Sequence, residues 1–205
     1  MDWYHIGERR RQSDKVRGEL LEAARALGAR SIKIGPGIGE DSADIDLMVK
    51  EFTVLCQQAA EVGANIVLEI MPFSNVRTVE TALAIVEGAD QPNGGLLLDI
   101  WHLQRGGIDF SEIARIPARF IKSVELNDAH RYPIEPLWMD TIHKRVLPGD
   151  GIFDIPAFIH AIQAKGYEGP WGLEVISDTH RKLPLEVMAN SAFESTMRQF
   201  NEGYA

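Results

Sequence analysis

The 205-residue sequence contains a single cysteine, Cys56, and no apolar run long enough to cross a bilayer. One cysteine excludes an internal disulfide framework and is typical of a reducing compartment. Cys56 falls on the apolar side of a helical pattern, which favours a buried structural thiol over a nucleophile. The first residues, MDWYHIGERRRQ, lack the apolar core of a signal peptide, so we expect a cytoplasmic protein without a membrane partner.

Positive charge is also scarce. The chain has 21 Lys and Arg against 30 Asp and Glu, a formal net charge of −9 and a pI of about 5.2. Because an acidic surface repels phosphate backbones, we expect no nucleic-acid partner. No linker rich in proline or serine divides the chain, and 45% hydrophobic residues suffice for one substantial core. We therefore expect residues 1–205 to form a single domain.

Helical and strand-like segments alternate along the chain. Strands are expected over residues 31–35, 65–70, 94–100, 119–126 and 171–176, with helices over 13–27, 45–63, 78–89, 109–116, 154–166 and the C-terminal segment. The C-terminal helix is expected to carry an apolar stripe of Phe193, Met197, Phe200 and Tyr204. Asp109 and Asp154 are plausible N-caps for two of these helices. The strands are continuous apolar runs, as expected for strands buried on both faces of a parallel sheet. The pattern predicts an α/β fold of repeated βα units.

Four of the expected strands place an acid at or near their carboxyl end: Glu69, Asp99, Glu125 and Glu174. A lone acid in this position is usually a helix N-cap or a solvated loop residue. In a parallel barrel, however, these strand ends converge on one mouth. Crowded carboxylates cost several kcal/mol each unless a divalent cation, or protonation of one acid, compensates. Oxygen ligands alone favour Mg or Mn over zinc or copper.

The motifs LEIMPFS, LLLDIWHLQRGG, VELNDAHR, RVLPGDG and GYEGPWGLEV together resemble the xylose-isomerase-like TIM-barrel superfamily, the sugar phosphate isomerase/epimerase group. The resemblance runs from about residue 19 to 199. It implies a divalent metal (Mn, Mg or Co) held by a Glu, an Asp, a His and a second Glu from four successive strands. Glu69, Asp99 and Glu174 match three of these ligands, and Glu125 stands in place of the His. The metal site would therefore carry an excess of negative charge.

The same resemblance implies substrate contacts. His102, the last residue of DIWH, matches a His that contacts substrate, although a buried histidine bonded to a carbonyl is an alternative. Arg131 in ELNDAHR matches an Arg that grips substrate oxygens, and Asp128 is acidic as in the family.

Three further residues each allow two interpretations of their role. Lys33 either projects toward the barrel mouth, which we favour, or simply ends a strand. Arg145 in HKRVLPGDG matches the family pattern for an anion or substrate contact, with an ordinary surface arginine as the alternative. Trp101 either forms an apolar wall for a sugar ring or belongs to the core.

The expected fold is thus of the (β/α) TIM-barrel type, apparently incomplete, with about five βα units and the N-terminal units missing. A complete barrel has eight units. A five-stranded arc would expose two sheet edges, and such edges invite pairing with another chain. We therefore expect a homo-oligomer or a partner subunit that completes the barrel.

By resemblance, the leading hypothesis is an isomerase or epimerase of a small sugar, polyol or hydroxy-keto acid. Glu69 and Glu174 would remove and return a proton through an enediolate, with metal assistance. The alternatives are a lyase of the inosose dehydratase type, which shares the first step, and a degenerate barrel subunit without activity. The endonuclease branch of the superfamily uses a His-rich zinc cluster and a basic DNA face, which this acidic sequence does not match.

Overall fold

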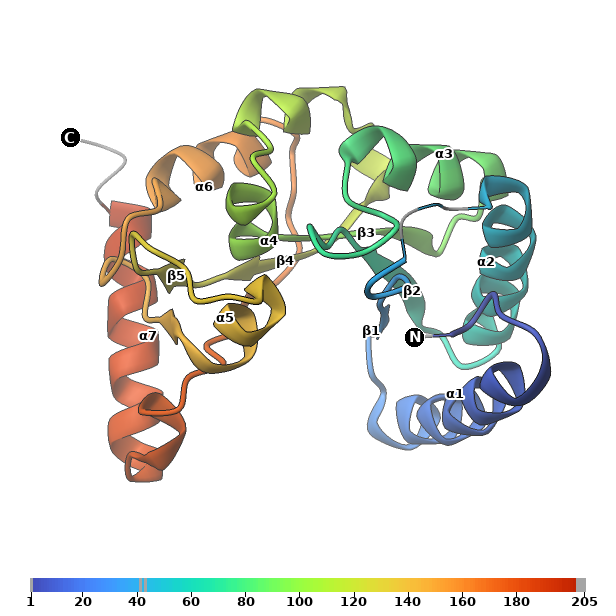
Figure 1. Cartoon of the computed structure of the whole chain (residues 1–205), viewed down its shortest axis with the longest axis horizontal. Helices are drawn as coiled ribbons and strands as arrows, with labels where there is room; N and C mark the ends of the chain where they lie inside the picture. Colours follow the sequence, from blue (N-terminus) through green and yellow to red (C-terminus); the bar gives the residue numbers. More distant parts are fainter. Residues whose placement is uncertain (1, 41, 43, 202–205) are drawn as a thin grey trace. The chain divides into compact units, whose positions relative to one another are not determined.

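The structure is a computed structural model that describes residues 2–40, 42 and 44–201 (Figure 1). The chain divides into two compact units. The first comprises Met1–Leu98 and Ile116–Ser123, and the second comprises Asp99–Arg115 and Val124–Ala205. Within the described residues, no helix is both long and apolar enough to span a membrane.

A parallel five-stranded sheet confirms the predicted α/β class. Its strands follow the order β1-β2-β3-β4-β7. Their bounds are Ser31–Ile34 (β1), Asn65–Glu69 (β2), Gly94–Asp99 (β3), Ile121–Leu126 (β4) and Trp171–Leu173 (β7). The register places Glu69 opposite Leu97 and Glu125 opposite Gly172. Because the strands are parallel, their carboxyl ends lie at one edge of the sheet.

The first unit is built around β2 and β3, which are almost entirely buried. Helices α2 (Ile45–Ala60) and α3 (Val79–Ala89) pack against each other beside these strands (Figure 1). Each begins at a residue whose side chain accepts a backbone N–H: Asp44 from Leu47 at 3.0 Å and Thr78 from Thr81 at 3.1 Å. Such N-caps supply acceptors that a helix start otherwise lacks. The unit also contains the 3-10 turn η2 (Ala118–Phe120).

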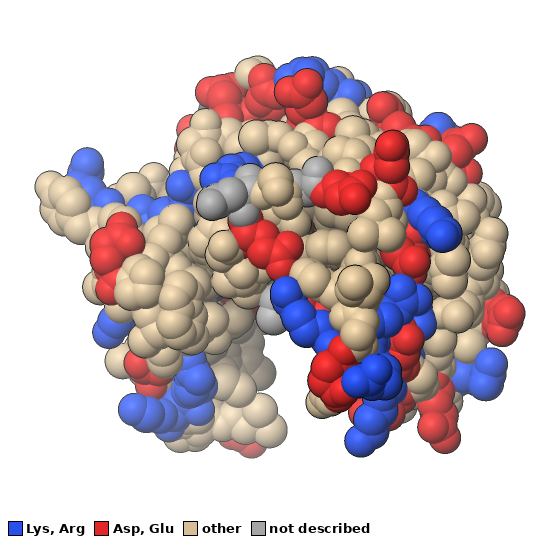
Figure 2. Space-filling view, turned by 45° about the vertical axis from the view of Figure 1, so that its right-hand side comes forward, with Lys and Arg blue, Asp and Glu red and all other residues tan. Residues whose placement is uncertain are grey.

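Helix α1 (Gly7–Leu27) begins six residues earlier than the periodicity indicates. Its first turns are held by ion pairs along the helix, such as Arg10–Asp14 at 2.7 Å, which apolar periodicity does not register. On the face shown in Figure 2, Lys and Arg side chains are intermixed with Asp and Glu. The apolar face of α1 is poorly covered: Ala24 is buried, whereas Leu27 is 82% exposed.

The second unit contains the remaining elements. They are α4 (Ile100–Arg105), η1 (Phe110–Arg115), β5 (Asp128–Ala129), α5 (Leu137–His143), β6 (Arg145–Val146), α6 (Ile155–Gln163), η3 (His180–Lys182) and α7 (Leu185–Asn201). The expected helix after Asp109 is a 3-10 helix, η1. Asp154 caps α6 as predicted, accepting the Ala157 N–H at 3.0 Å. β5 and β6 form a short antiparallel ribbon that the sequence did not predict.

The apolar stripe expected on the C-terminal helix is only partly packed. Phe193 and Met197 are 67% and 42% exposed, whereas Phe200 packs edge-on against Trp171 with ring centroids 5.1 Å apart. The fourth predicted member, Tyr204, lies outside the described residues. The buried positions of α7 are polar, Ser195 and Gln199.

Candidate functional site

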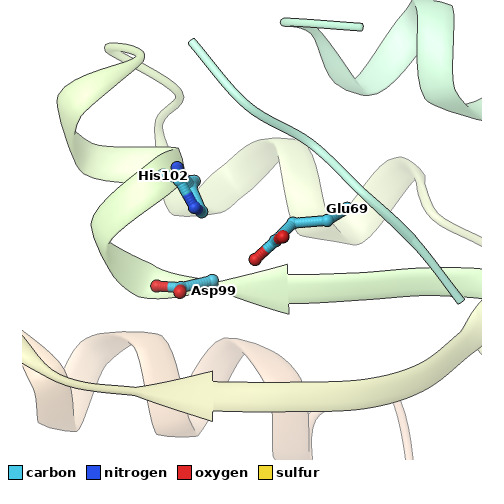
Figure 3. A group of neighbouring side chains, drawn as sticks. All are labelled: Glu69, Asp99 and His102. Atoms are coloured by element: carbon cyan, nitrogen blue, oxygen red, sulfur yellow. The ribbon is translucent and has the colours of Figure 1, made fainter. Parts of the chain in front are cut away.

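Asp99 ends the buried strand β3 and has two roles at once. Its Oδ1 accepts the Trp101 backbone N–H at 2.8 Å, so it is the N-cap of α4. The same oxygen accepts Asn127 Nδ2 at 2.9 Å. Figure 3 shows Asp99 at the tip of the strand and His102 on the helix that follows, together with Glu69. The interpretation of this acid as a helix N-cap is therefore confirmed. The cap uses only one of the two carboxylate oxygens of Asp99.

The second oxygen of Asp99 faces a buried arginine. Arg145 Nη1 lies 2.6 Å from Asp99 Oδ2 and 3.0 Å from Glu174 Oε2. The Arg145 side chain is 1% exposed, so the surface reading of this residue is wrong. Its guanidinium also lies over the Trp101 ring, 5.4 Å from the centroid. The structure gives Arg145 internal carboxylate partners, and its contact with a substrate anion stays a prediction.

These contacts determine the charge state of Asp99. Burial alone would raise the pKa of Asp99, because a low-dielectric environment disfavours a carboxylate. The Arg145 guanidinium and the Asn127 hydrogen bond outweigh burial and lower the pKa of Asp99 to about 2. Crowding of like charges therefore does not determine the pKa of Asp99.

Three acids from three strands converge within the second unit. Asp99, Glu125 and Glu174 each offer a carboxylate oxygen, and these oxygens lie within 4.8 Å of one another. Glu125 has room because its strand neighbour is Gly172, where a Cβ would lie 3.2 Å from Glu125 Cγ. With Arg145 among them, the three carboxylates carry a formal charge of −2. A divalent cation would balance that charge.

The two aromatic candidates are both buried. His102 is 3% exposed, and its Nε2 lies 3.3 Å from Arg145 Nη2. A guanidinium can only donate, so Nε2 is the acceptor in this contact. Trp101 is 0% exposed, with Arg105 as a second cation over its ring at 5.9 Å. The structure therefore favours the core reading of Trp101 over a wall for a sugar ring.

The first unit carries two of the predicted site residues. Lys33 Nζ lies 3.3 Å from Glu69 Oε1, and Glu69 is 2% exposed. Through this contact the Lys33 side chain reaches from β1 to the carboxyl end of β2. The side chain is 33% exposed. That Glu69 joins the acids of the second unit stays a prediction.

Arg131 is exposed in the loop after β5, outside the buried cluster. Asp128 is 1% exposed and binds backbone N–H groups of the loop after β6. Sequence reasoning missed Asn127 and Thr141, which donate to Asp99 and accept from Arg145 respectively. Strand alternation could have found Asn127, because it lies two residues beyond Glu125. The sequence carries no comparable signal for Thr141.

Comparison with known proteins places this arrangement in a family. The family described as Xylose isomerase-like TIM barrel matches residues 3–198. The chain belongs to this family. Among solved structures, a xylose isomerase-like TIM barrel/4-hydroxyphenylpyruvate dioxygenase fusion protein is similar with a TM-score of 0.87 and 26% identity, over 97% of this chain and 32% of that one. The IOLI protein, described with a binding zinc atom, has a TM-score of 0.82 and 24% identity, over 93% and 70% of the two chains.

Two kinds of enzyme are among the similar sequences. A 3-dehydroshikimate dehydratase of Pseudomonas aeruginosa is 34% identical over 153 residues, which cover 74% of this chain and 24% of the relative. An inosose isomerase of Bacillus velezensis is 27% identical over 183 residues, which cover 86% of this chain and 64% of the relative. The chain thus spans about a quarter of the dehydratase and under two thirds of the isomerase. Its five parallel strands correspond to part of the family's eight-stranded barrel.

Proposed function

We propose that this chain carries the acid–base site of an enzyme that removes a proton beside the carbonyl group of a small polyhydroxy keto compound. The first candidate activity is isomerase or epimerase. The observation that supports it most is the convergence of Asp99, Glu125 and Glu174 around Arg145 at the carboxyl ends of three strands. Active sites of barrels of this type form at those strand ends.

Glu174 is the proposed acid–base group of the second unit. Its side chain is 29% exposed, so a substrate can reach it, and Arg145 Nη1 holds one of its oxygens. Glu69, with Lys33 beside it, would supply the second carboxylate of the proton-removing and proton-returning pair. His102 and Arg131 would orient substrate oxygens. One carboxylate would take the α-proton and the other would return it to a different face or carbon, which changes the substrate without net loss of atoms.

The donor set fits a divalent cation. Asp99, Glu125 and Glu174 present oxygens at mutual distances under 4.8 Å, with a formal charge of −2 once Arg145 is included. These residues, joined by Glu69, would hold the ion. When bound, it would withdraw electron density from the substrate carbonyl and stabilise the negative charge of an enediolate. All-carboxylate ligation favours Mn or Mg, or Co, whereas the similar IOLI protein is described with zinc.

The test is proton exchange in D2O. The purified chain with Mn²⁺ would be incubated with inosose, a ketose and 3-dehydroshikimate, and deuterium at the carbon beside the carbonyl followed by NMR. Glu174→Gln should slow exchange by about 10²–10⁴-fold, the contribution typical of a positioned acid–base group. Glu168→Gln is a matched control, because Glu168 is an exposed glutamate in the segment before the same strand. Exchange by Glu174→Gln at the wild-type rate would refute the assigned role.

A dehydratase is the second candidate, because two 3-dehydroshikimate dehydratases are 34% and 31% identical to this chain. The first step would be the same. The electron pair left by the proton would then form a carbon–carbon double bond and expel the hydroxyl from the next carbon, which leaves as water by taking a proton from a carboxylic acid of the site. Loss of water, seen as a new absorbance of the conjugated product, would select this outcome. Deuterium incorporation without that absorbance would select the isomerase.

We also propose that another polypeptide segment covers the ends of the sheet, either a second copy or a partner subunit. The sheet ends at β1 and β7, and exposed strand edges readily pair with other strands. Light scattering should give a mass above the 22.8 kDa of one chain. A monomer that unfolds cooperatively would contradict the proposal.

Metal content by elemental analysis separates the enzyme from a degenerate subunit, which would bind no stoichiometric metal.

A further inference from the structure

Asp128 is a buried carboxylate surrounded by backbone N–H groups. Its Oδ1 accepts from Ala129 at 2.8 Å and Phe153 at 3.0 Å. Its Oδ2 accepts from Gly149 at 3.1 Å and Gly151 at 2.9 Å. Three of the four donors belong to the loop after β6, and the side chain is only 1% exposed. Hydrogen bonds to an ionised acceptor are among the stronger ones in proteins.

The sequence of that loop is fitted to the carboxylate. A Cβ on Gly151 would lie 2.3 Å from both Asp128 Oδ1 and the Ala129 carbonyl oxygen, so only glycine fits there. Gly149 has φ +89°, which side chains rarely adopt. The PGDG motif, residues 148–151, therefore keeps its backbone N–H groups directed at Asp128.

The same loop leads directly from Arg145. The ribbon of β5 and β6 pairs Asp128 with Val146 and Ala129 with Arg145. Asp128 thus fixes both the ribbon from which the Arg145 side chain departs and the loop that follows it. Arg145 in turn places its guanidinium against Asp99 and Glu174, with Nε 3.0 Å from Thr141 Oγ1.

We infer that Asp128 is a positioning residue that holds Arg145 among the acids of the site. It acts through the backbone of the PGDG loop. Loss of this anchor would release the guanidinium that bridges Asp99 and Glu174, and the acids would then repel one another. This inference rests on the proposed function, because the acids that Arg145 bridges, Asp99 and Glu174, belong to the proposed site.

The test follows the Arg145 Nε–H group itself by ¹⁵N NMR. Buried and bonded to Thr141, it should exchange slowly with water, and its signal is assigned by its loss in Arg145→Lys. Asp128→Asn turns one oxygen into an NH₂ group that faces two N–H donors. Exchange at Arg145 Nε should then be at least about tenfold faster, while the backbone amides of α6 keep their protection.

A matched control and a second variant complete the design. Asp150→Asn makes the same chemical change at an exposed acid of the same loop and should leave the Arg145 signal unchanged. Gly151→Ala keeps the Asp128 charge but forces the loop away, and should reproduce the effect of Asp128→Asn. A folded Asp128→Asn with an unchanged, slowly exchanging Arg145 signal overturns the inference. If both variants lose the dispersed amide spectrum, Asp128 is required for folding and the positioning role is rejected.

The readout needs neither metal nor substrate, so it is independent of the proposed function. A chain that exchanges no deuterium into any substrate would refute the activity and leave this test intact. If Mn²⁺ does bind, Asp128→Asn should change its Kd, and the same substitution in an Arg145→Met background should alter the Kd less than about twofold. An equal change of the Kd in both backgrounds would show that Asp128 does not act through Arg145.

Discussion

Replacement of Arg145 by Met tests the ion pair at the centre of the second unit. Arg145 and Asp99 are 1% and 0% exposed and lie 2.6 Å apart. Removal of one partner from a buried pair leaves an uncompensated charge and costs about 3–5 kcal/mol. For a chain of this size, that corresponds to a fall in Tm of about 6–20 °C. The isosteric methionine keeps most of the apolar stem, so lost packing contributes little.

The assay is urea unfolding in chelator-treated buffer, since a bound metal would add its own stabilisation. Arg181→Met is the control, because the Arg181–Asp178 pair is 48% and 44% exposed and such pairs contribute about 0–1 kcal/mol. The double variant Asp99→Asn with Arg145→Met should lower the free energy of unfolding by less than the sum of the single changes, because position 99 then carries no uncompensated buried charge. If Arg145→Met costs no more than Arg181→Met, the pair does not stabilise the unit as we argue.

Four further outcomes are expected. Burial raises the pKa of the Cys56 thiol to about 12, so DTNB at pH 8 should label it only as the protein unfolds; rapid labelling of the native protein would contradict this. Gly95→Ala should cost about 1–3 kcal/mol in urea unfolding, since its Cβ would lie 2.5 Å from the Phe120 carbonyl oxygen. Gly18→Ala, in an open position of α1, should stabilise by about 0.5–1 kcal/mol instead. Glu125→His should raise the zinc-to-manganese ratio bound from an equimolar mixture, because imidazole suits zinc better than manganese; an unchanged ratio would exclude Glu125 as a ligand.

The fold was largely predictable because hydrophobic periodicity reports burial directly. Strands β2 and β3 are nearly continuous apolar runs, and both lie where the sequence places them, within one residue at their ends. Elements held by polar contacts were less predictable. The start of α1 rests on ion pairs, and the ribbon of β5 and β6 has two residues in each strand. Neither leaves a periodic trace in an apolar pattern.

The acids of the site were predictable for a different reason. Asp99, Glu125 and Glu174 each follow an apolar run, and parallel strands carry such residues to one edge. Arg145 lies on a two-residue strand, so nothing in its local sequence distinguishes a buried cation from a surface one. Its burial becomes visible only from its tertiary partners.

The position of Arg145 also bears on the departure of this chain from the family pattern. The resemblance to the family implies a histidine where this chain has Glu125, and the glutamate adds one negative charge to the proposed ligand set. Arg145, within 2.6 Å of Asp99 and 3.0 Å of Glu174, returns one positive charge to the same cluster. The three acids and the arginine together carry −2, the charge that a divalent cation neutralises, and in the first unit Lys33 balances Glu69. Glu125 is therefore compatible with the proposed metal site, because Arg145 supplies a compensating positive charge from β6, and Asp128 binds the loop that follows this strand.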